Sequence, residues 1–130
     1  QLSIVAHSAR GQAMVSLLFF SVIAMTITTG AVMVMFSNSL GATRFQQGSV
    51  AYEVAQSGAE NAILRLLRDP SYTGEQGLRV GDGIADVQIT GSDPYIILST
   101  GRIGNFVRKI QVNVTYQNNT LIIISRQEIF

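Results

Sequence analysis

The hydropathy pattern is dominated by one long apolar segment near the start of the chain. Residues Met14–Phe36 form a run of about 23 uncharged, mainly apolar residues, and no Asp, Glu, Lys or Arg occurs between Gly11 and Thr43. A helix rises about 1.5 Å per residue, so a run of this length crosses the roughly 30 Å hydrocarbon layer of a bilayer. The pattern therefore predicts a transmembrane helix, to which we assign residues 12–36.

Two other interpretations of the apolar segment stay open. The first is a buried core helix, although the rest of the chain offers little surface to cover a helix that is apolar on all sides. The second is a cleaved secretory signal, with His7 and Arg10 at its basic end and residues 37–42 as the cleavage region. For a span, Arg10 and the absence of acids ahead of it favour a cytoplasmic N-terminus, so that the C-terminal part lies outside the cytoplasm.

An amphipathic pattern follows the apolar segment and predicts a helix over residues 37–69. This helix would end near Asp69-Pro70, because proline does not fit a helix interior. Within it, Arg65 is close enough to Glu60 and Asp69 for weak surface contacts. If the helix is unbroken from the membrane start, it is about 85 Å long and needs lipid or other subunits to cover it. The apolar or small residues that share one side of the helical period are Ala51, Ala55, Ala59, Ala62, Ile63, Leu66 and Leu67.

Period-two alternation replaces the helical period beyond Pro70. It predicts strands at residues 84–90, 95–100 and 121–125, and a long strand in which Ile110, Val112, Val114 and Tyr116 share one face. Short turns between successive strands imply an antiparallel meander of about four strands over residues 70–130. We therefore expect an α+β fold, in which a long N-terminal helix with a transmembrane half and an amphipathic half packs against a small antiparallel β-meander.

The charged residues and the single histidine restrict the possible chemistry. Charged residues make up 13% of the chain, and the net charge of +1 comes from bases interspersed with acids, so no nucleic-acid footprint is expected. The chain has no cysteine, and its one histidine, His7, precedes the apolar segment. A catalytic triad or a histidine-bearing zinc site in the exported domain is thereby excluded. We expect no enzymatic activity, no metal and no cofactor.

Several short segments resemble those of type IV pilins. Arg10-Gly11, followed by Gln12-Ala13-Met14 and the apolar run, resembles the processing site of type IV prepilins. The segment Val54–Glu60 looks like the A-E-S-G-L-E-type segment of minor pilins and pseudopilins, the related subunits of type II secretion systems. Residues Tyr95–Arg102 and Arg108–Val114 are similar to the sheet hairpin of that family. Together these segments are spread over most of the chain, from Arg10 to Val114.

The resemblance implies how the chain would be processed and where it would reside. Residues 1–11 would be a leader, cut after Gly11 by a prepilin peptidase, and Gln12 would become a methylated N-terminus. The subunit would wait in the inner membrane, in contact with lipid, and then be moved by an assembly platform into a cell-surface or periplasmic filament of pilin-like subunits. Most major pilins carry glutamate at the fifth mature position, where this chain has Ser16, which favours a minor pilin or pseudopilin.

Lateral packing of helices is the expected function of the N-terminal half. Small residues let helices approach each other closely, and apolar side chains fill the contact. The side chains expected to take part are Met14, Ser16, Leu17, Phe20, Ala24, Gly30, Ala31, Ala55 and Ala59. Two alternatives remain at this stage: a single-pass membrane protein whose exported β domain binds a partner without polymerising, and a soluble domain secreted after cleavage beyond residue 36.

Overall fold

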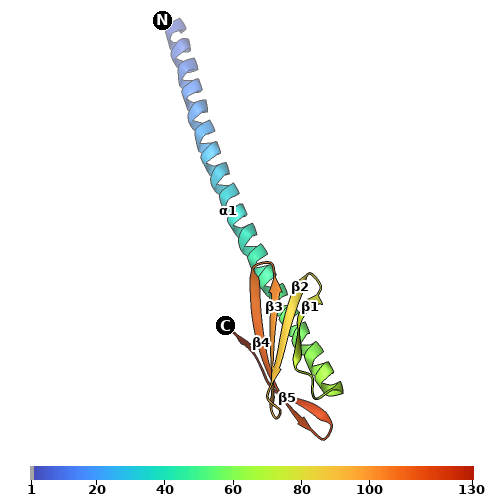
Figure 1. The fold of residues 1–130 in the computed structure, drawn as a ribbon. Helices are drawn as coiled ribbons and strands as arrows, with labels where there is room; N and C mark the ends of the chain where they lie inside the picture. Colours follow the sequence, from blue (N-terminus) through green and yellow to red (C-terminus); the bar gives the residue numbers. More distant parts are fainter. Residues whose placement is uncertain (1) are drawn as a thin grey trace. The chain divides into compact units, whose positions relative to one another are not determined.

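One helix and five strands make up the computed structural model, which describes residues 2–130 and the side-chain environment from Ala9 onward. Helix α1 (Leu2–Arg68) is followed by β1 (Gly74–Val80), β2 (Gly83–Thr90), β3 (Tyr95–Ile103), β4 (Phe106–Gln117) and β5 (Thr120–Ile129), as Figure 1 shows. The contacts divide the chain into two units, Gln1–Ala42 and Thr43–Phe130. We call the second unit the head.

The first unit is helical throughout its described part. Its least favourable stretch contains three threonines and Gly30, yet the helix is continuous there. The hydroxyls of Thr26, Thr28 and Thr29 donate to the carbonyl oxygens of Ile23, Ala24 and Met25 at 2.7–2.8 Å. These bonds satisfy the hydroxyl protons inside an otherwise apolar segment.

The head contains an antiparallel sheet in the order β1-β2-β3-β4-β5. The meander was predicted correctly, but it has five strands instead of about four, because the sequence pattern missed β1. That strand, GEQGLRV, contains two glycines and an irregularity between Glu75 and Leu78, so its side chains do not alternate regularly. Gly77 adopts a φ of 74° at this bulge, and its N–H donates to Asp86 Oδ1 at 2.8 Å.

The helical part of the head packs on one face of the sheet. Its buried side chains are Ala51, Val54, Ala55, Ala59, Ala62 and Leu66, and those of the sheet are Ala85, Val87, Ile97, Ile110, Val112 and Val114. The face predicted for the long strand is confirmed for its three buried members. Leu67, which was predicted to lie on the same side of the helix as Leu66, is 45% exposed.

Glycines set how closely the helix approaches the sheet. A Cβ atom added to Gly101 of β3 would lie 2.3 Å from the carbonyl oxygen of Ala51 and 2.4 Å from the amide nitrogen of Ala55. A Cβ atom added to Gly58 of the helix would lie 2.6 Å from Ser99 Oγ and 2.8 Å from Ala85 Cβ. Both contacts lie far below van der Waals separation, so only glycine allows this approach.

Candidate assembly surface

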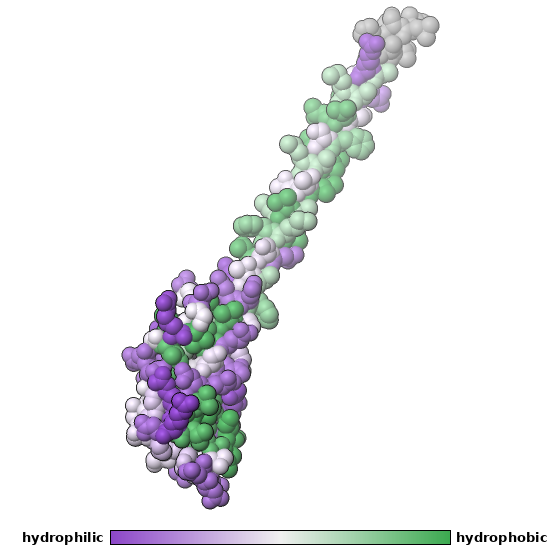
Figure 2. All heavy atoms as spheres, turned by 90° about the vertical axis from the view of Figure 1, so that its right-hand side faces the viewer, coloured by the Kyte–Doolittle hydropathy of each residue, from purple (hydrophilic) through white to green (hydrophobic). Residues whose placement is uncertain are grey.

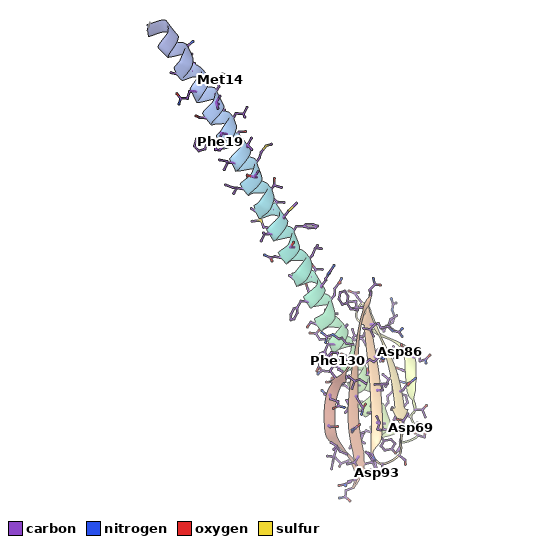
Figure 3. All side chains as sticks on the ribbon, turned by 90° about the vertical axis from the view of Figure 1, so that its left-hand side faces the viewer. Met14, Phe19, Asp69, Asp86, Asp93 and Phe130 are labelled. Atoms are coloured by element: carbon purple, nitrogen blue, oxygen red, sulfur yellow. The ribbon has the colours of Figure 1, made fainter. Side chains whose placement is uncertain are left out.

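The apolar half of α1 exposes its side chains in every direction around the helix axis. Leu17, Leu18, Phe19 and Phe20 are 65–73% exposed, although successive residues are about 100° apart around a helix. Figure 2 shows the apolar colouring along this segment, and Figure 3 labels Met14 and Phe19 as examples of its projecting side chains. A helix that is apolar on all sides requires an apolar environment.

The expected helix-packing residues of this half are all accessible. Met14 is 76% exposed, Leu17 73% and Phe20 71%, and the smaller residues Ser16, Ala24, Gly30 and Ala31 are also exposed. No side chain approaches Gly30 within 4 Å of the position of an added Cβ. The segment thus offers large apolar side chains beside positions where another helix can come close.

The length and composition of α1 allow it to cross a membrane. Its most apolar window of 18 residues, within Ala9–Arg68, has a mean hydropathy of 2.2 and none of its residues is buried. This overturns the alternative of a core helix buried within the chain. A signal sequence would pass the same test, so the finding defines one long apolar N-terminal helix, either a membrane span or a signal sequence.

The expected processing site lies in α1 as well. Gly11 and Gln12 are helical and exposed, and the position of a Cβ on Gly11 has no atom within 4 Å. The peptide bond at which cleavage is expected therefore joins two exposed residues of the helix.

Two of the expected helix-packing residues have a different role in the structure. Ala55 and Ala59 are fully buried in the core of the head, together with Val87, Ile97 and Val112. Their small side chains allow the helix to lie close to the sheet, so they are not available to another subunit. Sequence periodicity identified the correct side of the helix, but it could not distinguish packing on the chain's own sheet from packing on a neighbour.

The polar side of the helical part of the head forms an ion pair with β1, the strand that the sequence pattern missed. Arg65 Nη1 lies 3.1 Å from Glu75 Oε2 of β1, and its guanidinium lies 5.6 Å from the ring centre of Tyr72. This ion pair replaces the expected contacts with Glu60 and Asp69. Partial burial of the Tyr72 side chain raises the pKa of its phenol, and the negative charge of the Glu75 carboxylate also raises this pKa.

A short hydrogen-bonded turn at residues 69–72 connects the end of α1 to β1. The Ser71 hydroxyl and the Ser71 N–H both donate to Asp69 Oδ1, the latter at 3.0 Å. The side-chain hydrogen bond from Ser71, followed by the backbone one, lowers the pKa of the Asp69 carboxyl below its ordinary value of 3.8. The Tyr72 N–H also donates to the Asp69 carbonyl oxygen at 3.0 Å.

The face of the sheet near β1 carries an open depression of about 700 Å³. Its lining includes Gln76, Asp82, Asp86 and Arg102, and Asp86 forms an ion pair with Arg102. Within the described part of the chain, no three His, Cys, Asp or Glu side chains gather closely enough to hold a metal ion.

No protein-family model matches the chain, and no curated protein or solved structure is significantly similar to it. The architecture is nevertheless a definite one. A long, apolar N-terminal helix continues into a half that packs on a five-stranded antiparallel meander. This is a pilin-like architecture.

Proposed function

We propose that the chain is a structural subunit, a minor pilin or pseudopilin, that assembles through its N-terminal helix into a filament of the type IV pilus kind. Before assembly the helix resides in the inner membrane with the head outside the cytoplasm. The chain then has no enzymatic role and takes no cofactor. Its partners are membrane lipid, a prepilin peptidase, an assembly platform and other pilin-like subunits.

One observation carries the proposal. A segment that is apolar around its full circumference is joined, in one continuous helix, to a half whose apolar side is already covered by the chain's own sheet. Each fully buried large apolar side chain contributes about 1.5–3 kcal/mol, so a segment this rich in Leu, Ile, Met and Phe is strongly driven out of water. Lipid covers it in the membrane, and neighbouring helices can cover it in a filament.

The residues around the cleavage point support the same assignment. Gly11 has open space around it, and Arg10 is the last charged residue before the apolar run. The serine at position 16 supplies no carboxylate to pair with a neighbour's amino terminus, which is why we propose a minor subunit or pseudopilin instead of a major one.

Mass analysis of the mature N-terminus tests the proposal. The chain is produced with and without a prepilin peptidase, and membranes are analysed by intact mass. With the peptidase, we expect residues 1–11 to be absent and Gln12 to carry one methyl group. Gly11→Leu should retain the leader, whereas Gly41→Leu, at another open helical glycine, should be processed normally. Retention of residues 1–11 in the unmodified chain, despite an active peptidase, would contradict the proposal.

The depression beside β1 favours one alternative, a single-pass membrane protein whose head binds a partner without polymerising. Its lining combines Asp82, Asp86 and Arg102 with the apolar Ile84 and Ile103, a mixture found in ligand sites. Under this alternative, residues 1–11 are kept and the chain in the membrane does not assemble into a polymer that sediments. The same mass analysis therefore distinguishes this alternative from the proposed filament subunit.

A further inference from the structure

The end of the head at which α1 enters carries exposed aromatic and basic side chains. Phe45 is 81% exposed, and Arg44 beside it is also exposed. Arg44 is the first charged residue after the uncharged segment Gly11–Thr43. Chain connectivity therefore makes this the end of the head that follows the apolar helix directly.

The strands add further side chains of the same kinds to this end. The β3–β4 turn reaches it, because Arg108 Nη2 would lie 3.5 Å from a Cβ atom on Gly48, one turn after Arg44. Val107 is 49% exposed, and Lys109 is exposed beside Ile129 in the β4–β5 register. Phe130 follows Ile129, and Figure 3 shows it in the half of the head where α1 enters, with Asp93 at the opposite end.

Neither Arg44 nor Lys109 forms an ion pair within the described chain, whereas Arg108 pairs with Glu128 and Arg102 with Asp86. Two unpaired cations thus accompany Phe45, Val107 and Phe130. We call these five residues the entry rim. Exposed aromatic and aliphatic side chains beside unpaired bases are the composition that binds an anionic bilayer interface.

We propose that the entry rim docks on the anionic lipid headgroups of the leaflet next to the head while the subunit waits in the membrane. The inference rests on the proposed membrane residence and adds a second lipid contact to it. Docking holds the head against the bilayer, so removal of the subunit into a filament requires the release of this contact as well as the extraction of the helix.

The length of the uncharged segment sets the geometry of docking. Arg10 and Arg44 bracket it, and a helix between them is about 50 Å long, whereas a bilayer with its headgroup layers measures about 40–45 Å. A tilt of about 25–35°, within the usual range for membrane helices, brings both arginines to the headgroup regions.

Single tryptophans provide the test, because the chain contains none. Full-length Phe45→Trp is reconstituted in vesicles of phosphatidylcholine with 30% or with no phosphatidylglycerol, using lipids that carry a quencher at the headgroup or in the acyl chain. We expect headgroup quenching and a blue-shifted emission with the anionic lipid. Leu64→Trp is the matched control, since Leu64 is 61% exposed on the same helix about 28 Å further along; it should show neither effect.

Two further variants separate the possible outcomes. Phe20→Trp reports on membrane insertion itself and should be quenched from the acyl chain. Adding Arg44→Glu to Phe45→Trp should reduce the ratio of docked to undocked heads on anionic vesicles by about fivefold or more. If Phe20→Trp is quenched while Phe45→Trp behaves like Leu64→Trp, docking is wrong and membrane residence stands. If Phe20→Trp is not quenched, the proposed function fails first and the docking proposal falls with it.

Discussion

The close approach of α1 to β3 gives a quantitative test of the packing in the head. In Gly101→Ala, the new Cβ would lie 2.3 Å from the carbonyl oxygen of Ala51 and 2.4 Å from the amide nitrogen of Ala55. Both atoms belong to the helix backbone, so no side chain can rotate to relieve the contact. The helix must retreat by at least 0.7 Å to restore 3.0 Å, the limit below which real Cβ contacts essentially never occur.

This retreat loosens the whole buried side of the helix, because Ala51, Val54 and Ala55 lose contact with the sheet together. Overpacking of a well-packed core costs typically about 1–3 kcal/mol. For a domain of this size, each kcal/mol lowers the melting temperature by about 4–8 °C, so we expect a decrease on the order of 5–20 °C.

Thermal unfolding of the full chain in detergent measures this effect. The near-ultraviolet circular dichroism of tyrosine is a suitable signal, since Tyr52, Tyr72 and Tyr95 pack against the core and the chain has no tryptophan. Gly41→Ala is the control, because nothing lies within 4 Å of its added Cβ, and it should leave the melting of the head unchanged. A melting temperature for Gly101→Ala within 2 °C of the unmodified chain would show that the described contact between α1 and β3 is wrong.

Three further predictions follow from individual side chains. Leu66→Ala, at a fully buried leucine, should reduce the free energy of unfolding by about 2–5 kcal/mol, whereas Leu64→Ala, at an exposed one, should change it by less than about 0.5 kcal/mol in denaturant titrations. Because the pKa of Asp69 is lowered in the folded head, its carboxylate stabilises the fold above the unfolded value of 3.8, and this contribution is lost as the pH falls through the folded pKa. The NMR titration midpoint of Asp69 should lie below 3.8, and Asp69→Asn should weaken the acid dependence of stability between pH 5 and pH 2; a midpoint at or above 3.8 would contradict the Ser71 hydrogen bonds. Ala24→Arg, in the middle of the apolar run, should cost membrane insertion about 2.5–3.5 kcal/mol and reduce the share of chain in the membrane pellet, and Gln47→Arg, at an exposed polar position, should not; equal shares would argue against a span.

The sequence was sufficient for the parts of the fold that have a strong period. The end of the helix followed from Asp69-Pro70, and the buried face of β4 followed from Ile110, Val112 and Val114, because a proline and a strict alternation each leave few alternatives. β1 was missed because its glycines and its bulge at Gly77 remove the alternation, and the contacts that hold it, such as those of Gly77 with Asp86 and of Glu75 with Arg65, leave no periodic signal in the sequence.

The partner of each small residue was the least predictable feature of the assembly surface. Gly58, Ala55 and Ala59 carry the same signal as Gly30 and Ala31, namely small side chains on a helix, yet the first three meet the chain's own sheet and the other two are exposed. The helical period shows which residues share one side of the helix, but it does not show what covers that side. The structure shows that residues of β2, β3 and β4 cover it in the head. The aromatic residue Phe45 was also overlooked, because its exposure depends on where the sheet ends relative to the helix.

Fractionation of the unmodified chain from cells tests the central claim most directly, namely that residues 14–36 are first covered by lipid and then by other subunits. Cells with the assembly machinery are separated into membrane pellet, detergent-free soluble fraction and sheared extracellular material that sediments at high speed. We expect the chain in the membrane pellet and in the sedimenting extracellular material, without residues 1–11 in either. Recovery of the full-length chain as a monodisperse monomer in the detergent-free soluble fraction would contradict the account.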